Sequence, residues 1–261
     1  MPRVTSSRNP RVAHAQRLLA SSRDRRKAGR CVLEGEHVIA TYLDRIGVPE
    51  TLLIAETALG RPAIGALAAR VRPHDRLVVP ERVFRELGNL PPEVGVLAIV
   101  PTPQQQERKD AALCMLLDRV QDPGNVGTIL RTAAAAGVDE VLLSKDSAFA
   151  WSPKTLRAGQ GAQFLTTIVE DVDLAAWAGR FREAGGRVAA AVPRDGTTIY
   201  ACDLSRRIAI AIGSEGEGIS PSLLAACDLR FTIPMSHGVE SLNAAAAAAV
   251  ALFECVRQRR R

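Results

Sequence analysis

Short apolar runs alternate along this chain of 261 residues with longer segments in which apolar side chains recur every three or four positions. The runs are typical of buried strands, and the recurring pattern is typical of helices that bury one face. The pattern predicts strands at 31–35, 51–55, 76–80, 95–100, 113–120, 140–144, 166–170, 187–192, 207–213 and 230–235. It predicts helices at 9–28, 36–46, 62–70, 81–87, 126–136 and 174–184, and three more that begin near 152, 220 and 242. Strands that alternate with helices indicate an α/β fold whose sheets are mostly parallel and covered on both faces.

One segment interrupts this alternation. Residues 101–110, PTPQQQERKD, are polar, contain two prolines and show no period, as is typical of a linker. The whole chain is long enough for two domains of ordinary size. We therefore expect a smaller domain at 1–100 and a larger domain at 111–261.

The composition is that of a globular protein, with 47% hydrophobic and 24% charged residues. No apolar run approaches the roughly 20 residues that a membrane helix needs. The five cysteines are scattered and form no C-x-x-C pair, so we expect neither a disulfide framework nor a metal site. The N-terminus lacks the apolar segment of a secretory signal. Together these features predict a cytoplasmic protein.

The positive charge is concentrated in the N-terminal part of the chain. The net charge is +6, and residues 1–106 contain 16 Lys and Arg against 10 Asp and Glu, whereas residues 107–261 contain 18 of each. A localised basic surface is typical of proteins that bind a polyanion such as RNA, although a solvated basic helix has the same composition. The candidate RNA-binding residues are Arg8, Arg11, Arg23, Arg25, Arg26 and Lys27.

Three loops of the larger domain follow predicted strands, at the ends where parallel sheets bind their ligands. The first loop is DPGNVGTILRTA, residues 122–133. Asn125 is expected to cap the helix that follows, and Arg131 lies six residues further along. The N-terminus of such a helix offers free N–H groups, which favour an anion.

The second and third loops add glycines, carboxylates and a further helix start. IGSEGEGIS, residues 212–220, has acidic side chains where a phosphate-binding loop would have a lysine, so it fits neither the Walker A pattern nor the dinucleotide fingerprint. IPMSHGVESLNAA, residues 233–245, ends a strand and opens a helix, for which Ser241 is the expected N-cap.

Together and in this order, the three segments resemble the motifs of the SpoU/TrmH family of the SPOUT superfamily. These enzymes are S-adenosylmethionine-dependent RNA ribose 2′-O-methyltransferases. The resemblance spans residues 112–256, and the segments SRNPRV and VLEGEHVI resemble more loosely the substrate-binding domain of ribosomal RNA members. The alanines after Asn243 depart from the family's pattern. The matching positions are Asn125, Gly127, Arg131, Glu215, Gly216, Gly218, Ile233, Pro234, Met235, Ser241, Leu242 and Asn243.

The resemblance implies a C-terminal SPOUT domain with a parallel sheet and a trefoil knot, preceded by a smaller α/β RNA-binding domain. It implies that the knotted loops bind S-adenosylmethionine largely by main chain, so that the glycines at 213–218 let the backbone approach the ligand. It implies a homodimer, because family members pair through the knotted domain, and it implies no metal. The cofactor-binding residues that it implies are Gly213, Gly218, Ile233, Met235 and Leu242.

The catalytic residues that the resemblance implies are Asn125, Arg131, Glu215, Ser241 and Asn243. Family proposals assign Arg131 as the base that deprotonates the ribose hydroxyl. An arginine stays protonated at neutral pH, so we interpret Arg131 as a clamp for a substrate phosphate and leave the base open. The other four residues would hold Arg131 and the cofactor loops in place.

Several alternatives stay open from the sequence. Ribosomal RNA is the first choice of substrate, transfer RNA is the second, and an inactive RNA-binding homologue is a third reading. A nucleotide-dependent oxidoreductase lacks its fingerprint here. The sequence names neither the RNA nor the nucleotide, and it does not distinguish a housekeeping role from antibiotic resistance.

Overall fold

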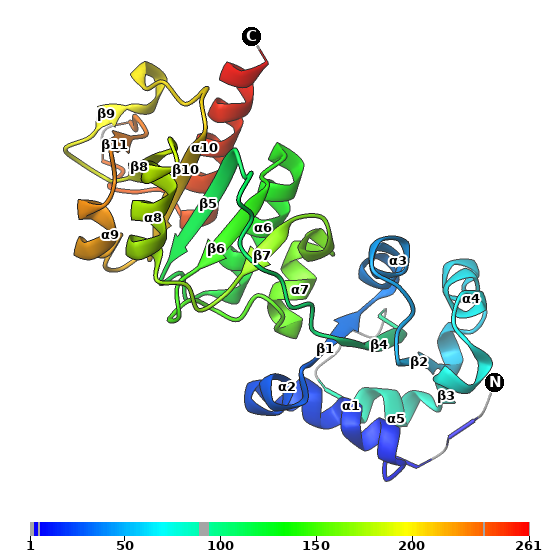
Figure 1. Cartoon of the computed structure of the whole chain (residues 1–261). Helices are drawn as coiled ribbons and strands as arrows, with labels where there is room; N and C mark the ends of the chain where they lie inside the picture. The colour runs from blue at the N-terminus through cyan, green and yellow to red at the C-terminus, as the bar shows by residue number, and fades with distance from the viewer. Residues whose placement is uncertain (1–2, 5, 89–93, 237, 261) are drawn as a thin grey trace. The chain divides into compact units, whose positions relative to one another are not determined.

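A computed structural model describes residues 3–4, 6–88, 94–236 and 238–260. They form two compact units (Figure 1). The first unit comprises Met1–Pro103 and Trp151–Phe164, and the second comprises Gln104–Ala150 and Leu165–Arg261. In the described part of the chain, no helix is both long and apolar enough to cross a membrane.

The first unit contains a four-stranded sheet in the order β1-β4-β2-β3. β4 runs antiparallel to β1 and to β2, and only β2 and β3 pair in parallel, so the expectation of a mostly parallel sheet is wrong for this unit. Strand direction depends on where a connection re-enters the sheet, which a local pattern does not encode. The strands are β1 (Arg30–Glu34), β2 (Thr51–Ala55), β3 (Arg76–Val79) and β4 (Val96–Pro101), and the helices between them are α3 (Glu36–Arg45), η1 (Glu56–Ala58), α4 (Pro62–Ala69), η2 (Pro73–Asp75) and α5 (Glu81–Glu86).

The long helix expected at 9–28 is two helices, α1 (Pro10–Ala20) and α2 (Ser22–Ala28). Ser21 separates them, because its backbone is extended, with φ −128° and ψ 118°. Its hydroxyl accepts the N–H of Asp24 at 3.1 Å and so caps α2. The helical pattern continues through the break, and only the capping preference of serine marks it.

Residues 151–164, expected in the C-terminal domain, belong to the first unit instead. They form α7 (Pro153–Gly159) and the short helix η3 (Ala162–Phe164). The ring of Phe164 packs edge-on against Tyr42, with ring centroids 5.3 Å apart. Nε of Arg157 on α7 donates to the Glu34 carboxylate on β1 at 2.9 Å. The alternating pattern predicts α7 itself but not the unit that it joins.

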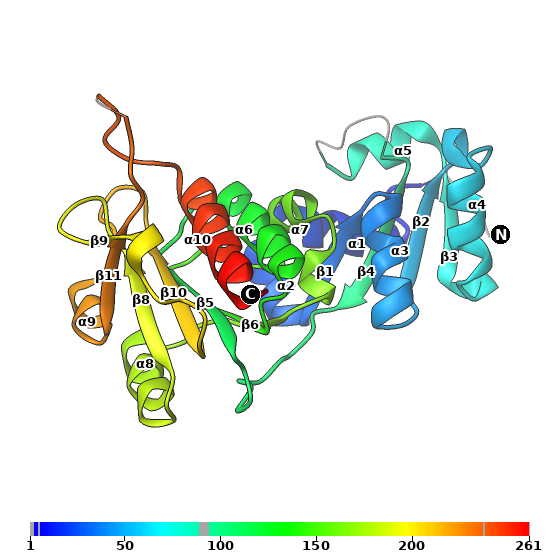
Figure 2. The same cartoon turned by 90° about the horizontal axis from the view of Figure 1, so that it is seen from above.

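The second unit is built on a seven-stranded sheet in the order β7-β6-β5-β10-β8-β11-β9. Each pair of neighbours is parallel, as the alternation of strands and helices predicts. α6 and α10 cover one face, and α8 and α9 cover the other (Figure 2). The elements are β5 (Leu113–Asp118), α6 (Pro123–Ala136), β6 (Glu140–Leu143), β7 (Thr167–Val169), α8 (Leu174–Glu183), β8 (Arg187–Ala191), β9 (Thr197–Thr198), η4 (Ile199–Ala201), β10 (Ile208–Gly213), α9 (Pro221–Ala225), β11 (Leu229–Thr232) and α10 (Ala244–Arg259).

The core of this unit follows the helical period of α8. Its inward face carries Leu174, Trp177, Ala178 and Phe181, which cluster with alternate residues of β5 and β10 and with Val188 of β8. The rings of Trp177 and Phe181 stack with centroids 4.7 Å apart. All residues of β5 are buried, as expected for a strand with helices on both faces. This rigid sheet fixes the strand ends that carry the candidate site.

Candidate active site

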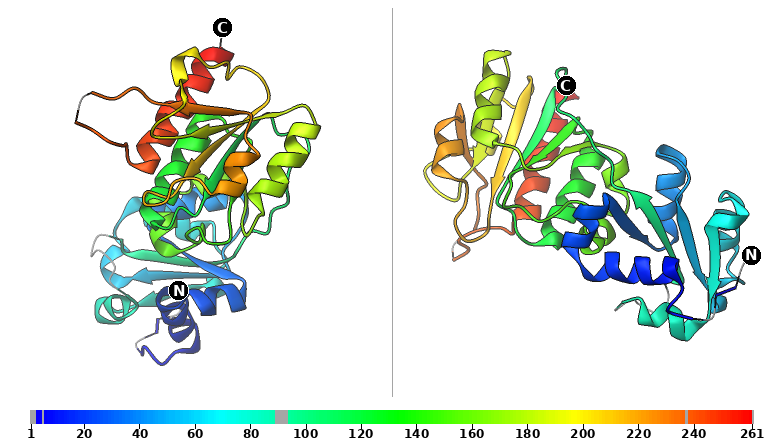
Figure 3. Two further views of the ribbon diagram at one scale, coloured as in Figure 1. Left: turned by 90° about the vertical axis from the view of Figure 1, so that its left-hand side faces the viewer. Right: turned by 60° about the horizontal axis from the view of Figure 1, so that its bottom comes forward.

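The three loops singled out in the sequence start at β5, β10 and β11, which lie within one run of parallel strands. β5 pairs with β10, β10 with β8, and β8 with β11, all in parallel, so their carboxyl ends lie on the same edge. The chain leaves β5 into α6, and it leaves β10 into the loop at 214–218. From β11 an extended connection, which Figure 3 shows, leads to α10. His237 of this motif lies outside the described residues.

The loop after β10 folds back tightly on itself. The N–H of Ser214 donates to the Gly218 carbonyl at 3.2 Å, and the N–H of Gly218 donates to the Ser214 carbonyl at 3.0 Å. A Cβ on Gly213 would lie 2.1 Å from the Gly218 carbonyl carbon. Gly218 has φ +68°, a conformation that favours glycine. The glycines at both ends thus close the loop, and a side chain at Gly213 is excluded by the main chain of Gly218.

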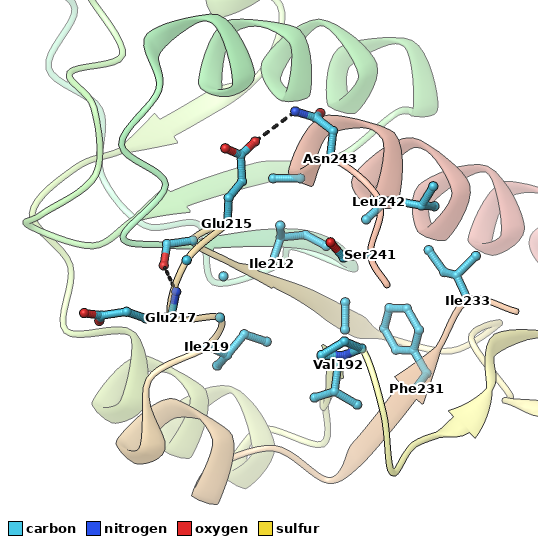
Figure 4. Close-up of a pocket in the computed structure, with 18 of the residues that line it drawn as sticks. Val192, Ile212, Glu215, Glu217, Ile219, Phe231, Ile233, Ser241, Leu242 and Asn243 are labelled. Atoms are coloured by element: carbon cyan, nitrogen blue, oxygen red, sulfur yellow. Dashed lines mark hydrogen bonds between the residues drawn. The ribbon is translucent and has the colours of Figure 1, made fainter. Parts of the chain in front are cut away.

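Asn125, Glu215 and Asn243, from three different loops, form one hydrogen-bonded cluster. Nδ2 of Asn243 donates to Oε1 of Glu215 at 2.9 Å and to Oδ1 of Asn125 at 3.0 Å (Figure 4 shows the first bond). Nδ2 of Asn125 also donates to Oε1 of Glu215. Hydrogen bonds to a charged acceptor are stronger than neutral ones, so this carboxylate holds the three loops in register.

Two helix caps differ from the sequence prediction. Asp122, not Asn125, caps α6, with its carboxylate accepting the N–H of Asn125 at 2.9 Å. Asn243, not Ser241, caps α10, with Oδ1 accepting the N–H of Ala245 at 2.9 Å. Because Asp122 takes the capping role, the carboxamide of Asn125 is available to Glu215.

A cavity of about 650 Å³ opens beside this cluster, between the loop after β10 and the start of α10. Its wall is largely apolar, and the close-up in Figure 4 shows Phe231, Ile233 and Leu242 around it. Glu215 and Glu217 border it, and among its described lining residues there is no lysine or arginine. All of the sequence-predicted cofactor residues line it, namely Gly213, Gly218, Ile233, Met235 and Leu242, as does Ser241.

Sequence reasoning missed one wall of this cavity, formed by Ala191, Val192 and Pro193 after β8. β8 lies between β10 and β11 in the sheet, so its carboxyl end meets the same edge. The run AAAVPR ends a strand without glycine or a charged pair, and the order of the strands would have been needed to find it.

The chain's described cysteines are free, and burial raises the pKa of Cys31 to about 12, which argues against thiolate chemistry there.

Arg131 is placed differently from the other predicted catalytic residues. It lies on α6 with an exposed side chain, six residues beyond Asn125, and it does not line the cavity. Six residues correspond to about 120° around an α-helix by the shorter way and about 9 Å along it, so the two side chains lie on different faces of α6. The single chain therefore brings Glu215, Ser241 and Asn243 to the cavity, with Asn125 hydrogen-bonded to Glu215 and Asn243 behind it, but not Arg131.

The model of the SpoU rRNA Methylase family matches residues 112–253, which contain all three loops. The chain belongs to this family. A Synechocystis protein described as an uncharacterized tRNA/rRNA methyltransferase is 33% identical over 98% of this chain and 93% of its own length. The 23S rRNA (guanosine(2553)-2′-O)-methyltransferase RlmP of Bacillus subtilis is 28% identical over 97% of this chain and 98% of its own length.

Solved structures of SpoU methyltransferases share the fold over both units. AviRb from Streptomyces viridochromogenes, in complex with AdoMet, has a TM-score of 0.86 and 28% identity, and the match covers 97% of this chain and 98% of that one. The family therefore accounts for the α/β fold, with a parallel sheet in the second unit and an additional unit at the N-terminus.

Two of the arginines predicted to bind RNA in this SpoU family member make hydrogen bonds within the first unit, and one of them, Arg25, is buried. Arg25 is only 6% exposed, and its guanidinium donates to the carbonyls of Leu18 and Leu19, the latter at 3.1 Å. Arg11 donates to the His74 carbonyl at 2.7 Å and to the Thr51 hydroxyl at 3.1 Å. Both arginines connect segments within the first unit, but only Arg25 is buried and therefore structural, whereas the Arg11 side chain is 34% exposed. The exposed candidates that remain are Arg8, Arg23, Arg26 and Lys27.

Proposed function

We propose that this protein transfers a methyl group from S-adenosylmethionine to a ribose 2′-hydroxyl of structured RNA, with ribosomal RNA as the substrate. The observation that carries the proposal is the cavity bordered by Glu215 and Asn243, whose side chains form a hydrogen-bonded cluster with Asn125. Its loops are those that match the family model. The relative RlmP is named a 23S rRNA 2′-O-methyltransferase, and AviRb is a SpoU methyltransferase with AdoMet bound.

The cavity fits S-adenosylmethionine in size, polarity and charge. A volume of about 650 Å³ lies in the range of small-molecule sites. An apolar wall that includes Phe231, Ile233 and Leu242 suits an adenosyl group, and the loop after β10 offers main-chain groups to polar edges. The cofactor carries a sulfonium cation and no phosphate, so bordering carboxylates and the absence of a lining lysine are compatible with it. When bound, the cofactor supplies the methyl group.

The described residues position the reaction rather than supply a nucleophile. Asn125 and Asn243 fix the Glu215 carboxylate, and Glu215 in turn ties the loop after β10 to both helix starts. These hydrogen bonds hold the wall of the cofactor cavity in a fixed position relative to the side from which RNA must approach. A fixed orientation of donor and acceptor lowers the activation free energy, because their rotational and translational freedom is lost before the reaction. Ser241 lies on the same wall.

Arg131 completes the site, on our proposal, from a second copy of the chain. Its side chain is exposed and does not line the cofactor cavity of its own chain, which is the arrangement expected if it serves the partner's site in a homodimer. There the guanidinium would clamp a phosphate next to the reactive ribose. Sedimentation equilibrium at micromolar concentration should give about twice 27.9 kDa. An active monomer would contradict this arrangement.

The decisive experiment supplies labelled S-adenosylmethionine to the purified protein with ribosomal and transfer RNA from cells that lack it. We expect label in ribosomal RNA, at a bond that becomes resistant to alkaline hydrolysis because its 2′-oxygen is methylated. The Arg131→Ala variant is the control for contaminating enzymes. Label only in transfer RNA would support the second candidate substrate, and label on a base would refute ribose methylation.

A further inference from the structure

Residues 107–261 carry 18 basic and 18 acidic side chains, yet a group of basic residues gathers at one edge of the second unit. This edge is the one where β5, β8 and β10 begin, opposite the strand ends that carry the candidate active site. Its basic residues, here called the amino-edge cluster, are Lys109, Arg187, Arg206, Arg207 and Arg259. A net charge of zero for this part of the chain therefore does not exclude a local basic surface.

Hydrogen bonds join the members of the amino-edge cluster into one surface. Nη2 of Arg207 donates to the Lys109 carbonyl at 3.2 Å, and the main-chain N–H of Arg187 donates to the Arg207 carbonyl at 3.0 Å. Nη2 of Arg259 donates to the Arg206 carbonyl at 2.5 Å, because the last turn of α10 lies beside the start of β10 (Figure 1). Five residues from four separate segments of the chain thus share one edge.

The guanidinium of Arg207 is held in place by groups that do not cancel its charge. Besides the Lys109 carbonyl, it donates to the carbonyls of Ala111 at 2.9 Å and Ala184 at 2.8 Å, and it lies 4.6 Å from the ring centroid of Phe181. Within the described residues, neither Arg207 nor Arg259 forms an ion pair with a carboxylate. A positioned guanidinium with its charge uncompensated loses little freedom when it binds an anion.

The carboxylates nearest to the amino-edge cluster already have other donors. Asp110 pairs with Arg108 at 3.1 Å, and Asp139 accepts two main-chain N–H groups at the start of β5 at 2.8 and 2.9 Å. Asp203 lies 3.7 Å from Arg206, whose side chain is 81% exposed, and such an exposed pair contributes little. The helix dipole accounts for a cation at the end of α10, but the other four residues of the cluster do not lie on helices.

We propose that the amino-edge cluster binds the phosphate backbone of the substrate RNA as a second contact, remote from methyl transfer, and this proposal rests on the methyltransferase function above. Guanidinium groups suit phosphate oxygens, and a row of cations over several strand starts suits an extended polyanion rather than one small anion. None of the five residues lines the cofactor cavity. β5, with six residues, separates the two edges by about 20 Å, so only an RNA that spans this distance contacts both.

The test removes two charges of the cluster from the full chain in the double variant Lys109→Gln/Arg206→Gln. Both side chains are exposed, and the hydrogen bonds that these residues accept use their main-chain carbonyls, so the fold should persist. Binding of ribosomal RNA is measured by filter retention over a series of salt concentrations. We expect Kd at low salt to rise at least about tenfold, and the log–log salt slope to flatten by about 1.4–1.8 for two lost contacts. The Kd for S-adenosylmethionine and kcat at saturating RNA should stay within about twofold of the wild type.

Two controls separate a contact surface from a general effect of charge. Lys109→Arg/Arg206→Lys keeps both charges and should bind RNA as the wild type does. Arg230→Glu, at an exposed position of β11, changes the net charge by the same amount as the Gln double variant and should flatten the salt slope less. Wild-type affinity and slope in the Gln double variant, or an equal loss in Arg230→Glu, would overturn the proposal. Failure of the proposed function is distinct, because then the wild-type protein would methylate no RNA, whereas this comparison measures binding alone.

Discussion

Gly213 is the position at which a single added methyl group should disturb the active site most. A Cβ there would lie 2.1 Å from the Gly218 carbonyl carbon, 2.3 Å from the Ile219 nitrogen and 2.4 Å from the Gly218 oxygen. All three atoms belong to the main chain, so rotation of a side chain cannot relieve the clash. The loop must move by about 1 Å or more to restore van der Waals separation.

The cost of that movement follows from the contacts of the loop. The two main-chain hydrogen bonds between Ser214 and Gly218, at 3.2 and 3.0 Å, are worth about 1 kcal/mol each. Overpacking adds about 1–3 kcal/mol. We therefore expect Gly213→Ala to lower the free energy of unfolding by about 3 kcal/mol. Because this loop walls the cofactor cavity, affinity for S-adenosylmethionine should fall at least about tenfold, which corresponds to about 1.4 kcal/mol.

Two neighbouring glycines provide matched controls. A Cβ on Gly216 would meet no protein atom within 4 Å, so Gly216→Ala should match the wild type in stability. Gly218 also has open space but φ +68°, so Gly218→Ala should lose about 1–2 kcal/mol of stability. Urea denaturation gives the stabilities, and titration calorimetry gives the affinities. Equal values for Gly213→Ala and Gly216→Ala would refute the steric reasoning.

Three further predictions follow from other parts of the structure. Arg131→Ala should reduce turnover by about 100-fold or more while cofactor affinity, measured by calorimetry, changes little, because the side chain does not line the cofactor cavity. Arg25→Ala should destabilise the protein by about 2–4 kcal/mol in urea denaturation, whereas Arg23→Ala should leave its stability unchanged and weaken RNA binding in a filter assay. Burial raises the pKa of Glu140 to about 7, above its value in the unfolded chain. The free energy of unfolding of the wild type should therefore fall as pH rises from about 4.5 through 7, by up to about 3 kcal/mol relative to that of Glu140→Gln. Parallel curves of the free energy of unfolding against pH for the two proteins would contradict this.

The period of the apolar residues predicted most elements because each strand or helix of the second unit buries a face that its own sequence specifies. α8 illustrates this, since its core residues recur at helical spacing and its bounds agree with the prediction to one residue. The two-residue strand β9 was missed, because Thr197 and Thr198 are exposed and carry no apolar signal. The strand β4 was predicted, but its antiparallel direction was not, because direction is a property of the whole sheet.

The candidate site was predicted by resemblance to a family rather than by spacing alone. Nothing in the local sequence indicates that Asn125 and Glu215, which are 90 residues apart, share a hydrogen bond. Capping preferences assigned the wrong residue twice, because Asp122 and Asn243 compete with Asn125 and Ser241 for the same helix starts. The charge pattern of the sequence predicts a basic segment. The sequence does not show which of its arginines are exposed, and the structure shows that Arg25 is buried and therefore not available to RNA.

The segment Trp151–Phe164 changes what removal of the first unit should do. The sequence alone predicts that a chain beginning at Glu107 folds, dimerises and binds S-adenosylmethionine. In the structure Trp151, Leu156 and Phe164 are buried in the first unit, so such a chain would expose three large apolar side chains. Each is worth about 1.5–3 kcal/mol of burial, and their exposure favours aggregation.

A polar version of the shortened chain separates folding from RNA binding. With Trp151→Ser, Leu156→Ser and Phe164→Ser, residues 107–261 should stay soluble and bind S-adenosylmethionine within about threefold of the full chain, because none of the three lines the cofactor cavity. They should fail to methylate RNA at sub-micromolar concentration, because residues 1–106 carry the whole excess of positive charge. Each lost phosphate contact should flatten the log–log salt dependence of RNA binding by about 0.7–0.9. Loss of cofactor binding in the soluble polar version would show that the second unit depends on the first for its fold. Full RNA methylation with an unchanged salt dependence would show that the basic segment is only a solvated surface.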